Sequence, residues 1–202
     1  MPRPVDFWFD FASTYSYLSA MRIEAEAEKR GVLVNWRPFL LGPIFTAQGW
    51  NTSPFAIYPA KGRNMWRDMQ RRADKYGLAF HRPDADQMAA FPSHSVLAGR
   101  CGLVALHEDW GKQFCRSVFE AQFAHAADIA DPVTIGDLID AAGGVSQTVL
   151  FSAHARGTKD LLRANVEEAK SLGIYGAPSF TVDGELFWGD DRLEDALDWA
   201  QR

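Results

Sequence analysis

Cysteine is scarce in this chain of 202 residues, which contains only Cys101 and Cys115. The two do not form a C-x-x-C pair and do not have the spacing of a metal site. The sequence therefore predicts free thiols in a reducing compartment rather than a disulfide-stabilised secreted fold. The histidines are scattered without an i, i+4 pair, so we predict no metal site. They are His81, His94, His107, His125 and His154.

Long apolar runs and an excess of positive charge are also missing. No apolar stretch approaches the length of a membrane span. The N-terminal residues MPRPVDFWFDF carry charges throughout and lack the apolar core and cleavage site of a signal peptide. Acidic residues outnumber basic ones, 26 to 21, and the formal charge of −5 argues against a nucleic-acid footprint. We expect a cytoplasmic protein that binds neither membranes nor nucleic acids.

Apolar residues make up 47% of the chain, which is enough for a substantial core. Residues 5–9 alternate between apolar and polar side chains as a strand does, and residues 32–39 form a second strand-like segment. Between them, from Tyr15 to Gly31, apolar residues recur at helical spacing. A long helix between two strands predicts a right-handed parallel β-α-β unit.

The middle of the chain has a different character. Residues 40–60 are rich in glycine, proline and aromatics, and a loop of this length is uncommon unless it is functional. A helix follows over residues 61–76. Residues 92–173 show only helical patterns, and the breaker residues fall near Gly111, Asp131-Pro132, Gly143-Gly144 and Gly157. We therefore expect an all-helical block in this region.

The C-terminal segment returns to strands. Residues 176–189, GAPSFTVDGELFWG, predict two short strands joined at Asp183-Gly184, a dipeptide typical of tight hairpins. The residues that follow predict a helix with acidic side chains at its N-terminus. The predicted order is β-α-β, a helical insertion, and then β-β-α.

This order, with Pro178 opening the third strand, resembles the thioredoxin fold, and the helical insertion is similar to that of the DsbA-like branch. The fold class is then α/β, with a thioredoxin-like domain from residues 1–40 and 174–202 and a loop plus helical insertion domain from 41–173. Redox members carry C-x-x-C at the head of the first helix, where this chain has Ser13 and Ser16. A hydroxyl cannot form a disulfide, so thiol-disulfide exchange is excluded at this site.

Four segments resemble the 2-hydroxychromene-2-carboxylate isomerases, which are relatives of the kappa-class glutathione transferases. They are FDFASTYSYL, WNTSPFAIYPAKGRNMWRD, YGAPSF and FWGDDRLEDAL. The resemblance implies glutathione as cofactor and interconversion of 2-hydroxychromene-2-carboxylate with trans-o-hydroxybenzylidenepyruvate, as in bacterial degradation of naphthalene and related aromatics. It also implies a homodimer and an aromatic oxo-acid as substrate. One departure is Thr14, which stands where the family usually has proline.

Ser13 is the catalytic residue that this resemblance implies, with its hydroxyl donating a hydrogen bond to the glutathione thiolate. Helix N-termini stabilise anions and lower the pKa of nearby thiols. Position alone favours a simpler role, an N-cap that accepts a backbone N–H and contributes about 1 kcal/mol. Ser16, one turn later, is expected to serve the helix rather than the chemistry.

The remaining site residues follow from the same resemblance. A cis bond at Pro178 would aim the backbone of Ala177 at the cysteinyl part of glutathione, whereas a trans proline would only begin an edge strand. Asp190 and Asp191 would bind the γ-glutamyl end or simply cap a helix. Arg192 would clamp a carboxylate or form a structural ion pair.

The long loop would supply the substrate side of the site. Lys61 suits a carboxylate of glutathione or of the substrate, and Asn51 suits hydrogen bonds to substrate oxygens. Trp50 would contribute to an apolar wall for an aromatic substrate, together with other aromatic residues of this region, each of which is individually more typical of a core. They are Phe55, Tyr58 and Trp66.

Two other functions fit the same sequence. A kappa-like transferase that conjugates glutathione to electrophiles, or reduces peroxides, would use the same site residues. A thioredoxin-like binding protein without catalysis would keep the fold, although the polar residues expected at the cleft argue against it.

Overall fold

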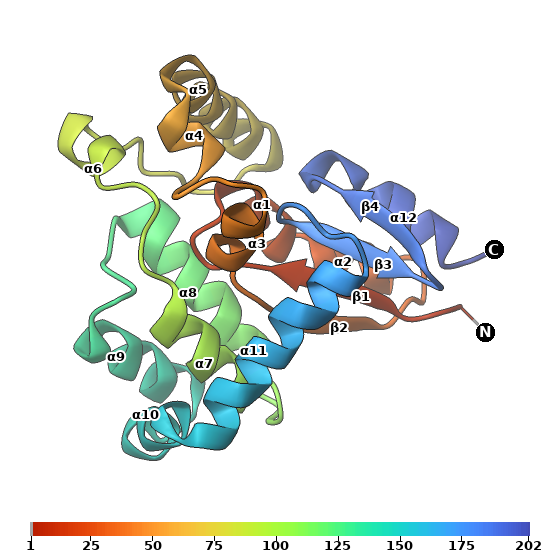
Figure 1. The fold of residues 1–202 in the computed structure, drawn as a ribbon. Coiled ribbons are helices and arrows are strands. Elements are labelled where there is room, and N and C mark those ends of the chain that lie inside the picture. Colours follow the sequence, from red (N-terminus) through yellow and green to blue (C-terminus); the bar gives the residue numbers. More distant parts are fainter. Residues whose placement is uncertain (1) are drawn as a thin grey trace.

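The computed structural model describes residues 2–202, which form a four-stranded mixed sheet surrounded by helices (Figure 1). The strand order is β2-β1-β3-β4. β1 pairs in parallel with β2 and antiparallel with β3, and β3 pairs antiparallel with β4. The strands are β1 (Val5–Phe9), β2 (Val34–Pro38), β3 (Ser179–Val182) and β4 (Glu185–Trp188). The predicted DsbA-like thioredoxin fold is confirmed.

The first helical segment is bent, where the sequence predicted one continuous helix. It consists of α1 (Thr14–Ala20) and α2 (Ile23–Glu28). At the bend the amide of Arg22 bonds to the carbonyl of Ser19, one residue closer than in a regular α-helix, which tightens the turn. The guanidinium of Arg22 reaches Glu194 at 3.0 Å, near the C-terminus. Long-range ion pairing thus accompanies the bend.

The prediction of a long loop over residues 40–60 is wrong, because this segment contains two short helices. The helices of this region are α3 (Leu41–Ala47), α4 (Pro54–Ile57), α5 (Pro59–Tyr76) and α6 (Ala85–Ala89). The carboxylate of Asp10 accepts the amide of Leu41 at the start of α3. Ser53 caps α4 by accepting the amide of Phe55. These caps satisfy N-terminal amides that a loop would leave to water.

The region beyond residue 92 is helical, as predicted. Its helices are α7 (Val96–Ala105), α8 (Gly111–His125), α9 (Pro132–Ala142), α10 (Ser146–His154) and α11 (Arg156–Ser171). Gly111 begins α8, Asp131 caps α9 and Gly143 ends it, as the sequence predicted. The predicted break at Gly157 is displaced, because the chain turns at Ala155, which is extended with φ −63° and ψ 149°.

The C-terminal hairpin and helix follow the prediction with one change. Asp183 and Gly184 both have positive φ, 55° and 85°, as a two-residue turn that matches strand twist requires. Beyond β4, the predicted single helix opens with a 3₁₀ turn, η1 (Asp190–Arg192), which leads into α12 (Leu193–Trp199).

The two faces of the sheet are covered differently. Helices α1, α2 and α12 lie against one face, and α11 crosses the other (Figure 1). Phe9 of β1 packs against Phe119 of α8 with 5.7 Å between ring centroids, so the core extends from the sheet into the helical insertion. On the opposite face, Trp8 lies in a second apolar cluster with Val166 of α11.

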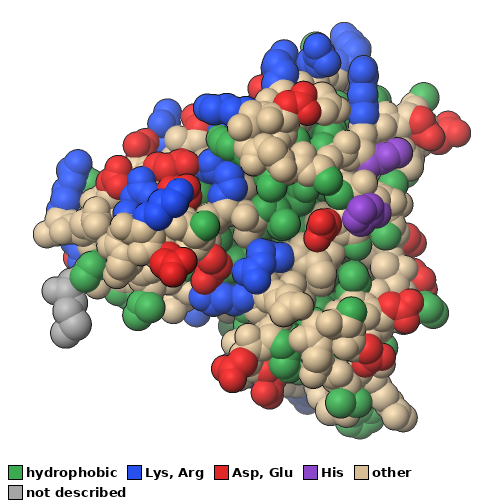
Figure 2. Space-filling model, turned by 180° about the vertical axis from the view of Figure 1, so that it is seen from behind, with side chains coloured by type: hydrophobic (Ala, Val, Ile, Leu, Met, Phe, Trp, Pro, Cys, Tyr) green, Lys and Arg blue, Asp and Glu red, His purple; other side chains and the backbone are tan. Residues whose placement is uncertain are grey.

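Charged side chains of both signs cover the face shown in Figure 2, and lysine and arginine gather at its top, where α5 lies. The exposed basic residues of α5 are Lys61, Arg63, Arg67, Arg71 and Lys75. None of the helices within residues 2–202 combines the length and the apolar composition needed to cross a membrane.

Candidate active site

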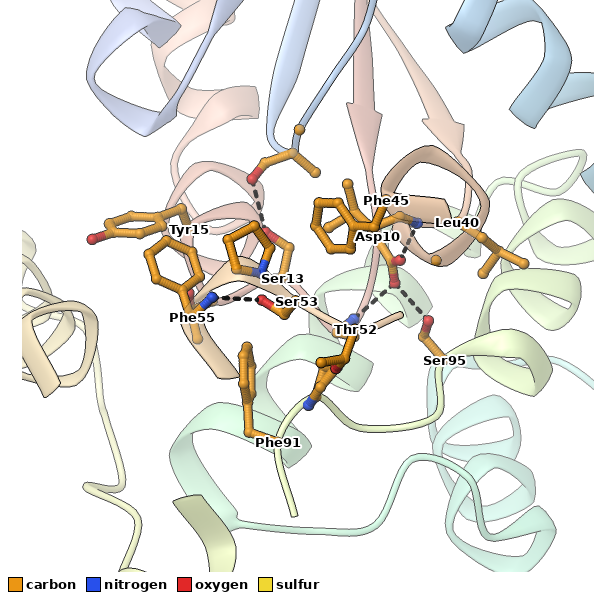
Figure 3. Close-up of a pocket in the computed structure, with 18 of the residues that line it drawn as sticks. Asp10, Ser13, Tyr15, Leu40, Phe45, Thr52, Ser53, Phe55, Phe91 and Ser95 are labelled. Atoms are coloured by element: carbon orange, nitrogen blue, oxygen red, sulfur yellow. Dashed lines mark hydrogen bonds between the residues drawn. The ribbon is translucent and has the colours of Figure 1, made fainter. Parts of the chain in front are cut away.

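A cleft of about 840 Å³ opens where the N-terminus of α1 meets α3, α4 and the start of α5. Its other walls come from the chain before α7 and from the loops on either side of the β3–β4 hairpin. In Figure 3, Ser13 lies among the aromatic side chains of Phe45, Phe55 and Phe91. The arrangement combines a polar helix terminus with an apolar wall.

Ser13 is buried at the N-terminus of α1, and its hydroxyl makes two hydrogen bonds. It accepts the backbone N–H of Ser16 at 3.2 Å, so the N-cap interpretation is correct. It also donates to the carbonyl oxygen of Ala177 at 2.9 Å, across 164 positions of sequence. The cap therefore uses a lone pair of the oxygen and leaves its proton directed toward the edge of the cleft.

The peptide bond between Ala177 and Pro178 is cis, in agreement with the sequence-based expectation. Ala177 lines the cleft and Pro178 does not, but the carbonyl oxygen of Pro178 accepts the amide N–H of Gly189 at 2.9 Å. The Ala177 backbone thus faces Ser13 and is held by the β3–β4 hairpin.

Asp190 is buried in an ion cluster that joins α1, α2, α5 and η1. One carboxylate oxygen accepts the hydroxyl of Ser19 at 3.0 Å and lies 3.5 Å from a guanidinium nitrogen of Arg22. The other accepts two N–H groups of Arg72, at 3.0 and 2.5 Å, and lies 3.4 Å from the hydroxyl of Tyr76. Asp190 borders the cleft, and these partners engage both of its oxygens, which favours a structural role; binding of a ligand's ammonium group by this carboxylate stays a prediction.

The neighbouring residues of this turn differ from Asp190. The side chain of Asp191 borders the cleft, is 56% exposed and, within residues 2–202, has Arg192 at 3.5 Å as its one ion-pair partner. It is the acid of this turn that is free to meet a ligand. The guanidinium of Arg192 bonds to Asp195 at 3.0 Å and does not line the cleft, so the structural ion-pair interpretation of this arginine holds.

Trp50, Asn51 and Lys61 all line the cleft. The ring of Trp50 packs near that of Phe45, and the ammonium of Lys61 lies 5.1 Å from the ring centroid of Tyr58. Two of the other aromatic residues proposed for the wall do not reach the cleft. Tyr58 lies outside it, and Trp66 is buried behind Phe91. Phe55 does line it.

Asp10, which the sequence analysis missed, links three segments that border the cleft through hydrogen bonds to its carboxylate. Its carboxylate accepts the amides of Ala12 at 2.9 Å and Leu41 at 2.7 Å, and the hydroxyl of Ser95 at 2.6 Å. Burial raises the pKa of Asp10, and these three hydrogen bonds oppose the rise. An acid directly after an apolar strand was the available signal in the sequence. That Leu41 and Ser95 are its partners could be known only from the folded structure.

Further cleft residues were missed because they come from distant segments. Tyr175 and Trp188 form an aromatic pair at the cleft, 4.9 Å apart, and each is about half exposed. His94 also lines the cleft, in a segment for which the sequence indicated no role. Nothing in the local sequence distinguishes these residues from ordinary surface positions.

Neither of the two cysteines lines this cleft. Cys101 and Cys115 are buried and unpaired, and burial raises the pKa of the Cys101 thiol to about 12. Within residues 2–202, no three histidine, cysteine or acidic side chains gather as metal ligands would. Within residues 2–202, the cleft that holds Ser13 is lined by hydroxyl, amide, charged, aromatic and aliphatic side chains together with backbone groups.

Comparison with known proteins places the chain in a family. Residues 4–199 match the model of the DSBA-like thioredoxin domain. The chain is 25% identical to a 2-hydroxychromene-2-carboxylate isomerase of Sphingobium xenophagum, covering 96% of both proteins. It is 26% identical to glutathione S-transferase kappa 1 of Caenorhabditis elegans, covering 100% of this chain and 92% of that protein. A solved 2-hydroxychromene-2-carboxylate isomerase superposes with a TM-score of 0.80 at 22% identity, covering 97% of this chain and 93% of that one. The chain belongs to the DSBA-like thioredoxin domain family.

Proposed function

We propose that this protein is a glutathione-dependent isomerase that interconverts 2-hydroxychromene-2-carboxylate and trans-o-hydroxybenzylidenepyruvate, or a closely related aromatic oxo-acid pair. The observation that carries the proposal is the hydroxyl of Ser13, at a helix N-terminus in a cleft with an aromatic wall. The relatives named as isomerases and as glutathione transferases support both the reaction class and the cofactor.

The groups that line the cleft match glutathione in charge and in hydrogen-bonding capacity. The Ala177 backbone borders the cleft beside Ser13 and suits a peptide added alongside it. Asp191 offers a free carboxylate for an ammonium group, and Lys61 offers a cation for a carboxylate. An extended tripeptide with an amine at one end and carboxylates at both therefore meets complementary groups in this cleft.

Glutathione supplies a thiol nucleophile whose reversible addition lets a conjugated double bond rotate. The chain's task at the sulfur is to favour the thiolate, through the hydroxyl of Ser13 and the N-terminal amides of α1. A thiol pKa lowered by two units corresponds to about 2.7 kcal/mol in favour of the thiolate. Ser13 is the residue proposed to provide this stabilisation.

The aromatic lining of the cleft suits the substrate. Phe45, Trp50 and Phe55 present apolar surface for an aromatic ring, and Asn51 offers an amide to its oxygens. Holding the ring against this wall would orient the unsaturated carbon toward Ser13, which lowers the entropic part of the barrier.

The test is isomerase activity of Ser13→Ala, measured by the absorbance change of the chromene with and without glutathione. A hydrogen bond to a charged group contributes about 1.5 to 3 kcal/mol, so kcat should fall by about 10- to 150-fold. Ser16→Ala is the matched control, since Ser16 is equally buried in α1 and its hydroxyl has no partner within residues 2–202. Wild-type turnover that is independent of added thiol would refute the proposal.

A kappa-like transferase is the second candidate, favoured by the Caenorhabditis elegans relative. Activity toward chlorodinitrobenzene or peroxides, with none toward the chromene, would support it. A non-catalytic binding protein would instead show no glutathione binding in calorimetry at millimolar concentration.

A further inference from the structure

His94 lies in the same cleft as Ser13, in the short segment that leads into α7. Its side chain is exposed, and no residue of the described chain, 2–202, hydrogen-bonds or ion-pairs with it. An imidazole that lines the same cleft as Ser13 and has no hydrogen-bond partner among residues 2–202 is available to a ligand bound there.

The side-chain hydroxyls of the residues on both sides of His94 make hydrogen bonds to other parts of the chain. On one side, Ser93 accepts an N–H from the Gln122 side chain at 3.1 Å. On the other, Ser95 donates to an oxygen of Asp10 at 2.6 Å. His94 is therefore presented from a fixed stretch of chain rather than from a free loop.

The same Asp10 oxygen ties this stretch to the proposed catalytic serine. It accepts the amide of Ala12 at 2.9 Å as well as the hydroxyl of Ser95. The neighbours of Ser13 and His94 thus meet on a single atom, and Figure 3 shows the hydrogen bond between Ser95 and Asp10 to one side of Ser13. This shared contact brings the two segments together at the cleft.

The other charged groups facing the cleft are already engaged or unsuited to moving a proton. Asp10 accepts three hydrogen bonds, and Asp190 is paired with Arg72. Asp68 accepts the hydroxyl of Tyr15 and pairs with Arg71. Lys61 and Asp191 are open charges suited to binding glutathione. Histidine is the side-chain type that both accepts and donates a proton near neutral pH.

We propose that His94 is the proton-transfer residue for opening the chromene ring, an inference that rests on the proposed function. The neutral imidazole of His94 takes the proton of the substrate's hemiketal hydroxyl. The carbonyl forms as the bond between that carbon and the ring oxygen breaks, and the bond's electron pair goes to the ring oxygen. The imidazolium then returns the proton to this oxygen, giving the phenol and restoring neutral His94.

The test is the activity of His94→Gln toward the chromene in saturating glutathione. Positioned acid–base groups contribute at least about a hundredfold, so kcat should fall by about that factor at neutral pH. The pH profile of kcat should also change, since glutamine cannot exchange a proton with the substrate. Added imidazole should restore part of the activity of His94→Ala. His107→Gln, a change at an exposed histidine outside the cleft, is the matched control.

Two further measurements separate this inference from the proposed function. Calorimetry should give the same glutathione affinity for His94→Gln as for the wild type. A wild type that requires glutathione, together with a His94→Gln variant that keeps its kcat and pH profile, would overturn the inference alone. A wild type with no glutathione-dependent activity would overturn the proposed function on which it rests.

Discussion

Asp190→Asn and Asp191→Asn form a pair of substitutions whose effects should differ, because two adjacent acids of the same turn have different surroundings. Asp190 is 2% exposed and lies between the guanidiniums of Arg22 and Arg72. Removing its charge leaves two arginines facing each other, and Glu194 remains as the partner of Arg22 alone. This is the situation in which breaking a buried ion pair is costly.

The expected loss can be estimated from the burial of the partners. Removing one member of a buried pair costs about 3 to 5 kcal/mol. Since the side chains of Arg22 and Arg72 are 12% and 25% exposed, we take the lower end, about 3 kcal/mol. For a chain of this length, each kcal/mol lowers Tm by about 2 to 4 °C. Asp190→Asn should therefore lower Tm by about 6 to 12 °C.

Asp191→Asn should show the opposite pattern. Its side chain is 56% exposed with one distant ion-pair partner, so stability should change by no more than about 0.5 kcal/mol. Loss of a charge partner for the ammonium group should weaken glutathione binding by about tenfold. Thermal unfolding and calorimetric titration of both variants provide the comparison. A stable Asp190→Asn beside a destabilised Asp191→Asn would refute the assignment of roles.

Two other predictions concern the frame of the cleft. Burial raises the pKa of Asp10, so its carboxyl group binds a proton more tightly in the folded chain than in the unfolded chain. The contribution of Asp10 to stability is therefore greatest at acid pH and is lost as pH rises through the raised pKa. Urea unfolding between pH 4 and pH 7 should therefore show a less negative dependence of stability on pH for Asp10→Asn than for the wild type, and parallel curves would contradict this. In Gly62→Ala, the new Cβ would lie 2.4 Å from the carbonyl oxygen of Phe55, forcing α4 away from α5. We expect the free energy of unfolding, measured with denaturant, to fall by about 1 to 3 kcal/mol and KM to rise. A variant as stable as the wild type would show that α4 and α5 can move apart without cost.

The parts of the fold that could be predicted depend on local signals. Strand β1 followed from an alternating pattern, and the β3–β4 hairpin followed from Asp183-Gly184, whose positive φ values few residue pairs adopt readily. In both cases the signal and the structure lie within a few residues of one another. The cap at Asp131 was predictable for the same reason, since its side chain bonds to amides two and three residues later.

The parts that could not be predicted depend on partners far away in sequence. The start of α3 is capped by Asp10, which lies 31 positions earlier, so residues 40–47 resembled a loop. Asp190 and Asp191 are indistinguishable in sequence, because only Arg22 and Arg72 show which carboxylate is occupied. His94 becomes a candidate only when the fold brings its segment to the cleft.

Ser13 shows how the capping and catalytic hypotheses can hold together. Its oxygen accepts the amide of Ser16, and its single proton goes to the carbonyl of Ala177. For the proposed reaction that proton has to turn toward the sulfur, and a peptide N–H bound along Ala177 would replace it at the carbonyl. Ser13→Ala removes both roles at once. The lost cap costs about 1 kcal/mol of stability, too little to unfold a typical domain, whereas the lost donor acts directly on the thiolate. Ser13→Ala should therefore lose much of its activity while its stability falls only slightly. If unfolding alone accounted for the loss of activity, Ser13 would have only the role of an N-cap.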